Sequence, residues 1–252
     1  MSTTSMATGK LGKLPVRTDV RTLRIAQYVD EARLPEAPER LDLAAGVRAW
    51  PLYANDTRGD CTTAAAAHMV EAWTAAARGR PVEVSESAVL RAFERVKIVD
   101  PFTGEEGAFA LDVLKLWRAS GIGRHRIGAF VRVAAYDHRL VRSAAWLFGG
   151  LYVGLALPLT ARTQRIWEWT GELGGDAKPG SWGGHAVDVV RYDRAGLTVV
   201  TWGRLQRMTW SFWERYCEEA YCALSEDFVE HGRAPNGFDL EALRADLALV
   251  TA

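Results

Sequence analysis

The feature that most constrains the fold of this sequence is a polar loop that runs directly into an alanine-rich segment, over residues 55–73. Alanine has high helix propensity and a glycine follows Arg78, so we expect a helix from Cys61 to about Arg78. Cys61 then lies in the first turn, where free backbone N–H groups and the helix dipole favour a thiolate over a thiol. The thiolate is the nucleophilic form, so this position predicts a catalytic cysteine; a small buried cysteine is the alternative.

A histidine far downstream strengthens the catalytic prediction. His185 follows the glycine-rich stretch 179–184 and begins the apolar stretch 186–192, which has the composition of a buried strand. A histidine beside a thiol can hold its proton and deliver it later to a leaving group. We therefore predict that Cys61 and His185 form a pair, with the sulfur and a ring nitrogen within about hydrogen-bond reach.

The bulk properties exclude several classes of protein. The 252 residues, of which 48% are hydrophobic and 25% charged, suit one domain or two closely packed halves. The formal net charge of zero argues against nucleic acid or an anionic membrane as a partner. Cys61, Cys217 and Cys222 have neither the spacing of a disulfide framework nor that of a zinc site, so we predict no metal and no cofactor.

The chain is predicted to have three parts. Residues 1–34 are a disordered or wrapping segment, in which residues 1 to about 15 are disordered, and a pro-segment is the less favoured interpretation. Residues 35–235 are the main domain, and residues 236–252 carry a C-terminal helix packed on it. Neither a signal peptide nor a membrane-length apolar run is visible, so a cytoplasmic location is expected.

Within the main domain, helical periodicity dominates about residues 52–125 and strand patterns dominate about residues 126–228. The segment 160–179 is predicted to be a long loop. We expect further helices and strands over the ranges Ser85–Val96, Ala110–Ser120, Ile127–Ala135, Asp137–Phe148, Leu151–Leu157, His185–Tyr192, Leu197–Trp202, Trp210–Glu219, Ala220–Leu224 and Leu240–Leu249. This order predicts an α+β fold in which a helical half carrying Cys61 packs against an antiparallel β half carrying His185, with a site between them.

Several short motifs in this order resemble the papain-like cysteine peptidases, and most closely bacterial members without disulfides. The resemblance covers about residues 35–228. It includes a helix similar to the family's second interdomain helix at 111–121 and a helix, glycine and apolar strand at 141–157. The motifs are Asp42-Leu43, Trp50-Pro51, Asn55 to Cys61, Gly184-His185-Ala186-Val187, Tyr192-Asp193 and Thr201-Trp202-Gly203.

The resemblance implies roles for further residues. Asn55 stands where the family has a glutamine that donates to the oxyanion, and the backbone N–H of Cys61 is the second donor. Thr201 stands sixteen residues after His185, where the family has the asparagine that orients the histidine. If the Trp-Gly pair sets the register instead, Val200 takes that position. Trp202 shields the contact from water.

Other residues receive structural or cleft assignments. The substrate cleft is expected to include Gly59, Asp60, Trp182, Gly184 and Trp202, although Asp60 is also a candidate helix cap. Asp188 is expected on the opposite strand face from His185. His68 is interpreted as a packing histidine. His125, His138 and His231 are expected to be solvated, and Cys217 and Cys222 buried.

The function implied by the resemblance is a cysteine hydrolase that cleaves a peptide or other amide bond through an acyl-enzyme on Cys61. Two alternatives stay open at this point. The same acyl group can pass to an amine, which makes the protein an acyltransferase. A papain-like scaffold can instead have lost catalysis and bind a peptide or protein partner. The sequence leaves the oligomeric state undetermined.

Overall fold

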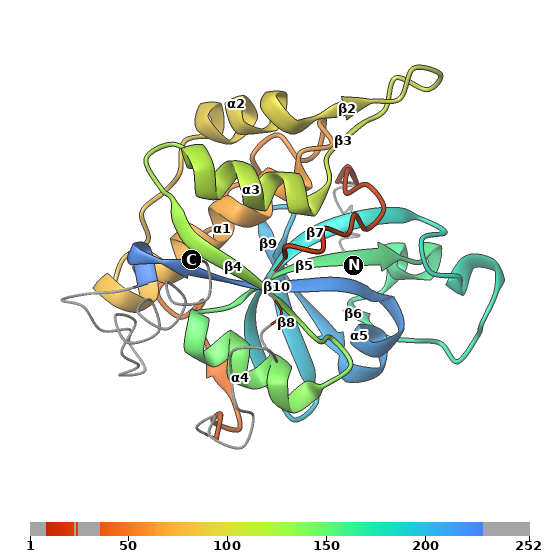
Figure 1. The fold of residues 1–252 in the computed structure, drawn as a ribbon. Helices are drawn as coiled ribbons and strands as arrows, with labels where there is room; N and C mark the ends of the chain where they lie inside the picture. Colours follow the sequence, from red (N-terminus) through yellow and green to blue (C-terminus); the bar gives the residue numbers. More distant parts are fainter. Residues whose placement is uncertain (1–8, 23, 25–35, 229–252) are drawn as a thin grey trace, which may run out of the picture.

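The computed structural model describes residues 9–22, 24 and 36–228 (Figure 1). Its helical half consists of α1 (Cys61–Arg78), α2 (Glu86–Val96) and α3 (Ala110–Ser120), as the sequence predicts. Helix α1 ends where Gly79 adopts the left-handed conformation, with φ of 72°, and its N–H caps the Ala75 carbonyl. The small alanines of α1 allow close packing, and the helix is buried along most of its length.

The second half is built on a twisted sheet that contains eight strands within the described residues. Its main path has the order β4-β10-β5-β7-β8-β9-β6, and β1 pairs with β7 outside this path. All pairs are antiparallel except β6 with β9. The strands are β1 (Leu41–Asp42), β4 (Ile127–Val133), β5 (Leu151–Leu157), β6 (Ile166–Trp167), β7 (Gly183–Asp193), β8 (Gly196–Thr201), β9 (Arg204–Thr209) and β10 (Cys217–Ser225). A separate hairpin pairs β2 (Ile98–Val99) with β3 (Glu106–Gly107).

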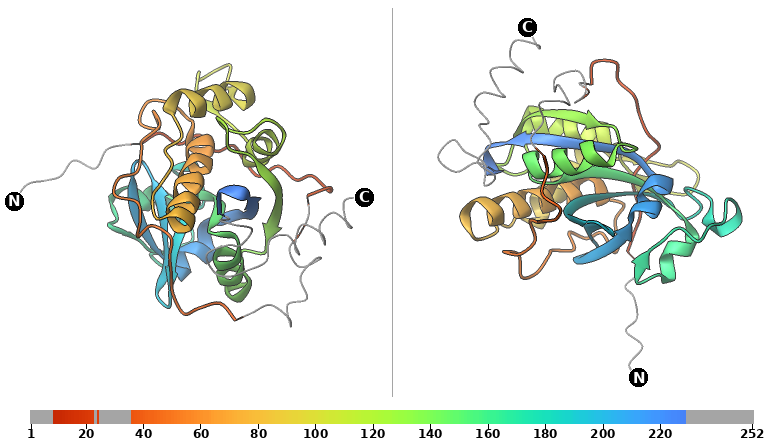
Figure 2. Two further views of the ribbon diagram at one scale, coloured as in Figure 1. Left: turned by 90° about the vertical axis from the view of Figure 1, so that its left-hand side faces the viewer. Right: turned by 90° about the horizontal axis from the view of Figure 1, so that it is seen from below.

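Helix α1 joins the two halves because it packs on β7, β5 and β8 while also contacting α2 and α3. Two polar contacts fix it there: the Tyr152 hydroxyl donates to the Thr62 carbonyl at 2.9 Å, and the Trp73 indole donates to the Phe148 carbonyl at 3.1 Å. Figure 2 shows α1, α2 and α3 gathered at one side of the sheet. The remaining helices, α4 (His138–Phe148) and α5 (Trp210–Tyr216), pack on other parts of the same sheet. The predicted α+β class is confirmed.

Some predicted boundaries differ from the structure. Strand β10 begins at Cys217, three residues before the predicted start at Ala220, because the chain passes directly from α5 into pairing with β5. The segment 160–179, predicted to be one long loop, contains short 3₁₀ helices and strand β6, which holds Trp167 in the core. The predicted helix at 240–249 and the segment boundary at 236 lie outside the described residues.

The N-terminal segment differs most from its prediction. Residues 9–14 were expected to be disordered, but they form backbone hydrogen bonds to both halves of the molecule. Figure 1 shows this red segment passing between the helices α1 and α3 and the strands β5 and β7. The glycines and lysines of this segment show no hydrophobic periodicity, so its own sequence does not indicate an ordered structure. The segment is ordered by its hydrogen bonds to residues on both sides of the cleft.

Candidate active site

Cys61 is the first residue of α1 and is only 1% exposed. Its sulfur accepts a hydrogen bond of 3.4 Å from the backbone N–H of Ala186, the residue after His185 on β7. Burial raises the pKa of the Cys61 thiol to about 12, the nearby Asp60 adds to the rise, and the N–H groups of Ala186 and Gly12 partly oppose it. Desolvation therefore outweighs the helix N-terminus, and the cysteine is a neutral thiol in this conformation.

His185 lies on β7 and is equally buried. Its Nε2 is 2.6 Å from the Thr201 hydroxyl oxygen, and its ring stacks on Trp202 with centroids 4.4 Å apart. Burial lowers the pKa of His185 to about 3, and the neighbouring His68 adds to this shift. The imidazole is therefore neutral. When Nε2–H donates to Thr201, the free Nδ1 is left as the basic nitrogen.

The predicted hydrogen bond between the Cys61 sulfur and the His185 ring is not made in this conformation. Nδ1 of His185 has no hydrogen-bond partner among the described residues, and the sulfur instead faces peptide N–H groups. The two residues are nevertheless brought together, since Ala186 follows His185 directly. The Cys61 thiol and the His185 imidazole are both uncharged and shielded from solvent, so the electrostatic attraction of a thiolate–imidazolium pair is absent.

Thr201, rather than Val200, is the residue of β8 that reaches His185. Val200 pairs with Asp188 and is buried in the core. The chain turns immediately after β8, with positive φ values of 46° at Trp202 and 69° at Gly203. This turn places the indole of Trp202 over the imidazole and buries the contact between His185 and Thr201.

Asn55 lies at the other side of the cysteine, in a loop whose preceding residues Tyr53 and Ala54 have positive φ values of 57° and 62°. The Asn55 side-chain amide donates to the carbonyl of Lys10 at 3.3 Å. The indole N–H of Trp202 donates to the same carbonyl at 3.1 Å. Two side-chain donors from opposite halves of the molecule thus converge on one peptide carbonyl oxygen.

The cleft between the two halves is filled by residues 9–14 in an extended conformation. Gly12 and Lys13 both donate their N–H groups to the Gly184 carbonyl, at 3.3 and 3.1 Å. Ala108 receives the segment on the other wall, donating to the Gly12 carbonyl at 2.8 Å and accepting from the Leu14 N–H at 3.0 Å. A Cβ on Gly12 would lie 1.9 Å from the Gly59 carbonyl oxygen, so the close fit at the cysteine requires glycine.

Three of the remaining predicted cleft residues contact or border this segment, and one does not. Gly59 and Gly184 touch it, while Trp182 lines a cavity of about 890 Å³ beside it. Asp60 is fully buried, and neither carboxylate oxygen has a partner among the described residues. The prediction that its side chain caps α1 is wrong. Burial raises the pKa of Asp60 to about 7, with the Asn55 amide opposing the shift.

The other titratable residues have structural contacts. His68 packs between Trp50 and Tyr53, and its Nε2 lies 2.8 Å from the Pro51 carbonyl oxygen, which agrees with a packing role. His125 was expected to be solvated, but it is 7% exposed because its ring is drawn inward to Asp227, at 2.9 Å.

The remaining histidine and cysteine predictions have mixed outcomes. His138 stacks on Trp210 with centroids 4.3 Å apart and is only partly exposed, and His231 lies outside the described residues. Cys222 is buried as expected, whereas Cys217 is only partly buried, because it stands at the start of β10 beside a cavity. Asp188 is fully buried opposite Tyr152 of β5, and neither of its carboxylate oxygens has a hydrogen-bond partner among the described residues.

Sequence reasoning missed Lys13 and the two glutamates that bind its side chain. Lys13 inserts between Glu218 and Glu219 of β10. The available signals were the repeated Gly-Lys-Leu triplet at residues 9–14 and the adjacent acidic pair, but nothing in either indicates that the two meet.

The described residues contain neither a cluster of metal ligands nor a membrane-length apolar helix. No group of three or more His, Cys, Asp and Glu side chains in the described ranges is arranged to hold a metal ion. Among the helices in the same residues, none has the length and apolarity that a membrane crossing requires.

Comparison with solved structures identifies the fold. Xylellain, a cysteine protease from Xylella fastidiosa, superimposes with a TM-score of 0.64 at 14% identity, over 86% of this chain and 96% of the other. Procathepsin B S9 from Trypanosoma congolense gives 0.59 at 12% identity, over 86% and 87%. Recombinant stem bromelain precursor gives 0.54 at 15%, over 86% and 77%.

These structures define the class: the chain has the fold of the papain-like cysteine peptidases. No protein family model matches the sequence, and no curated protein matches it. The identities of 12 to 15% to these three structures establish the architecture alone.

Proposed function

We propose that the protein is a cysteine hydrolase that cleaves a peptide or other amide bond through a thioester on Cys61, and that residues 9–14 hold it in a latent form. The observation that carries this proposal is that the cleft over Cys61 already binds an extended peptide by main-chain hydrogen bonds. Gly184 and Ala108 provide these bonds from opposite walls. Main-chain recognition of this kind suits peptides of many sequences.

The chemistry follows from the groups around the cleft. The Cys61 thiolate attacks the carbonyl carbon, and the oxyanion that forms is held by the Asn55 amide and the Cys61 N–H. His185, after taking the thiol proton on Nδ1, gives it to the departing amine as the C–N bond breaks. Water then attacks the thioester with His185 as general base, which releases the acid and restores the thiol.

Thr201 and Trp202 act on His185 rather than on the substrate. The Thr201 hydroxyl holds Nε2 in one orientation, and Trp202 covers that contact. A hydroxyl accepts the same N–H bond as an amide carbonyl but is smaller and rotates freely, so it orients the ring less strongly.

Latency follows from what the segment presents to the nucleophile. The Gly12 N–H, which donates to the Gly184 carbonyl, also lies close enough to the Cys61 sulfur to oppose the rise in the pKa of the thiol, so the bound segment occupies the space over the nucleophile. It also excludes the water that would stabilise a thiolate–imidazolium pair. Catalysis therefore requires the segment to leave the cleft.

The decisive experiment uses a variant in which the segment is expelled but the site is intact. In Lys13→Glu, a third carboxylate meets Glu218 and Glu219, and repulsion favours release. We expect this variant to hydrolyse a peptide mixture, with products identified by mass spectrometry, and Lys13→Glu combined with Cys61→Ser to be inert. Products that form equally without the Cys61 thiol contradict the proposal. Binding of peptides without cleavage supports the scaffold alternative, and transfer to an added amine supports the acyltransferase.

A further inference from the structure

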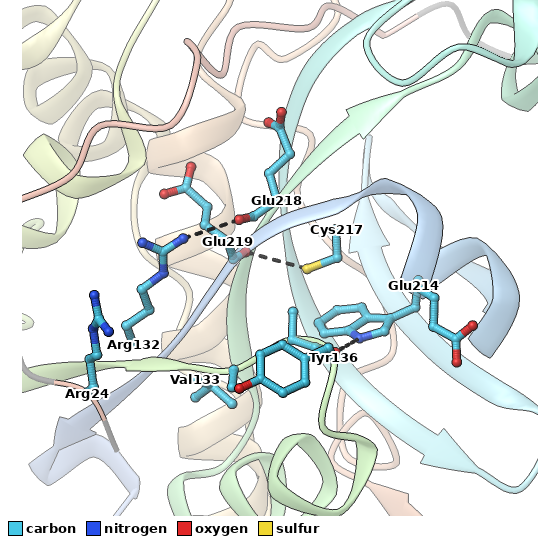
Figure 3. Close-up of a pocket in the computed structure, with 11 residues that line it drawn as sticks. Arg24, Arg132, Val133, Tyr136, Glu214, Cys217, Glu218 and Glu219 are labelled. Carbon is cyan, nitrogen blue, oxygen red and sulfur yellow. Dashed lines mark hydrogen bonds between the residues drawn. The ribbon is translucent and has the colours of Figure 1, made fainter. Parts of the chain in front are cut away.

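A cavity separate from the cleft over Cys61 opens where the sheet meets α5 (Figure 3). Its volume is about 700 Å³, which lies within the range of small-molecule sites. The walls come from Arg24, from β4 and the residues that follow it, from α5 and from the first residues of β10. Neither Cys61, nor His185, nor any residue of the segment 9–14 lines this cavity.

Two acidic residues on the wall direct their charges elsewhere. The carboxylates of Glu218 and Glu219 lie 2.8 and 3.3 Å from the ammonium of Lys13, and Glu219 also accepts a hydrogen bond of 2.9 Å from the Tyr221 hydroxyl. Successive residues of a regular strand face opposite sides, but the pairing of β10 with β5 shifts register between Cys217 and Glu219, and a bulge re-aims side chains. In the view of Figure 3 both carboxyl groups lie above β10, and the sulfur of Cys217 lies below it. The two charges are therefore directed to Lys13 and not to the cavity.

The other groups on this wall add little negative charge. Glu214 is 58% exposed, and its Oε1 lies 3.1 Å from Nε2 of His138. Figure 3 shows the Glu214 carboxylate turned away from the two arginines. Burial raises the pKa of the Cys217 thiol, so this group is neutral. The cavity therefore keeps a positive character at its arginine end.

Arg24 and Arg132 form that end. An isolated parallel bridge joins their backbones, and Figure 3 shows the two side chains next to each other. Like charges at directly opposed positions destabilise paired strands, and an anion between them relieves the repulsion. Arg132 donates to the Glu218 backbone carbonyl at 3.4 Å, which uses one of the five N–H groups of its guanidinium. The planar guanidinium fork is suited to the paired oxygens of a carboxylate or phosphate group.

The rest of the cavity is apolar or aromatic. Val133 and Trp213 are buried, whereas Tyr136 is 86% exposed. The Trp213 indole N–H already donates to the Ala135 carbonyl at 2.7 Å, so this wall needs no further polar partner. Aromatic rings pair well with a further ring in offset or edge-to-face geometry. The cavity thus combines an anion-binding end with a surface for an apolar ring.

We propose that the cavity binds a small organic anion, with a carboxylate or phosphate group between Arg24 and Arg132 and an apolar ring against Tyr136. Both head groups offer the paired oxygens that a guanidinium binds. The inference goes beyond the proposed hydrolysis and does not depend on it, because the residues placed in that mechanism do not line the cavity.

The first test measures binding by isothermal titration calorimetry with phenyl phosphate, phenylacetate and the neutral 2-phenylethanol. We expect both anions to bind and the alcohol not to bind, and the tighter anion identifies the preferred head group. Arg132→Gln should weaken the binding of both anions at least about tenfold, because charge-assisted hydrogen bonds are lost. The matched control is Arg126→Gln: Arg126 is exposed, also donates to a backbone carbonyl, that of Arg118, and lies outside the cavity. Equal binding by the two variants, or binding of the alcohol as tight as that of the anions, overturns the inference.

The second test uses Tyr136→Ala, which alters the cavity at an exposed position and leaves the arginines in place. It should weaken the binding of phenyl phosphate at least about threefold and leave the weaker binding of inorganic phosphate unchanged. Inorganic phosphate that binds the unaltered chain as tightly as phenyl phosphate overturns the inference, because the cavity then holds an ion and no ring. An unchanged affinity of Tyr136→Ala for phenyl phosphate overturns it too. Neither test requires catalysis, so the result stays distinct from whether the protein cleaves peptides.

Discussion

The two ends of the segment 9–14 are held in opposite ways. Around Cys61 and His185 the contacts are backbone hydrogen bonds, and both side chains are buried and neutral. One residue farther along, the ammonium of Lys13 meets two carboxylates. The difference indicates a division of tasks: the neutral end keeps the nucleophile inactive by excluding water, while the charged end holds the segment in register.

The largest expected effect comes from reversing the charge at the lysine end. Lys13→Glu should increase the rate at which iodoacetamide alkylates Cys61 at least tenfold. Breaking a buried ion pair costs about 3–5 kcal/mol, less where one partner is partly exposed as Glu218 is, and about 1.4 kcal/mol corresponds to a tenfold change. Lys10→Glu, at an exposed position, is the control and should leave the rate unchanged. Equal rates in the two variants would show that the backbone contacts alone hold the segment.

The second prediction tests the neutrality of the cysteine end through pH. Because burial raises the pKa of Cys61 to about 12, alkylation of the unaltered chain should climb about tenfold per pH unit without reaching a plateau by pH 10. Water enters when the segment leaves, so the midpoint in Lys13→Glu should fall. Adding His185→Ala should raise it again, because the imidazolium partner is lost. A midpoint that does not respond to His185 means that the histidine does not activate the thiol.

The contrast between the two ends also explains what the sequence could predict. The helix that begins at Cys61, the Gly149-Gly150 break and the apolar strand Leu151–Leu157 carry their own local patterns, and all three were predicted. The spacing of sixteen residues between His185 and Thr201 spans one tight turn between neighbouring strands, so counting along the sequence identified the residue that the structure places at the ring.

The lysine end was not predictable in this way. Lys13 and Glu218 are 205 residues apart, and their contact depends on the cleft, β5 and β10 being assembled first. The charge states at the cysteine end were missed for a related reason. Position in the first helical turn favours a thiolate, but burial depends on which chain covers the residue, and here it is residues 9–14.

A smaller effect is expected at Thr201, whose hydroxyl orients the His185 ring. Once the segment is expelled, Thr201→Val should lower turnover about fivefold, since one hydrogen bond contributes about 1 kcal/mol. Thr201→Asn should restore or raise it where the amide fits beneath Trp202. Turnover and the pH midpoint of alkylation should be measured together, because a packing defect alone would leave that midpoint in place. Unchanged turnover in Thr201→Val means that another group orients His185.

The smallest effect concerns Asp60, the buried carboxyl next to the cysteine. Burial raises its pKa from 3.8 to about 7, so the folded protein binds its proton more tightly than the unfolded chain does. Its contribution to stability is fully present below pH 3.8 and is lost as the pH rises through about 7. Asp60→Asn should therefore flatten the decline in unfolding free energy between about pH 4 and pH 7, measured by urea titration.

The same substitution sharpens the comparison between the two ends. An Asp60 carboxylate opposes a thiolate at Cys61, so Asp60→Asn should shift the alkylation midpoint to slightly lower pH. Glu218→Gln, at the charged end, should leave that midpoint unchanged whenever the segment stays bound, because its partner is Lys13 and not the thiol. If Glu218→Gln moves the midpoint as far as Asp60→Asn does, the charged end influences the thiol directly, and the division of tasks between the two ends is wrong.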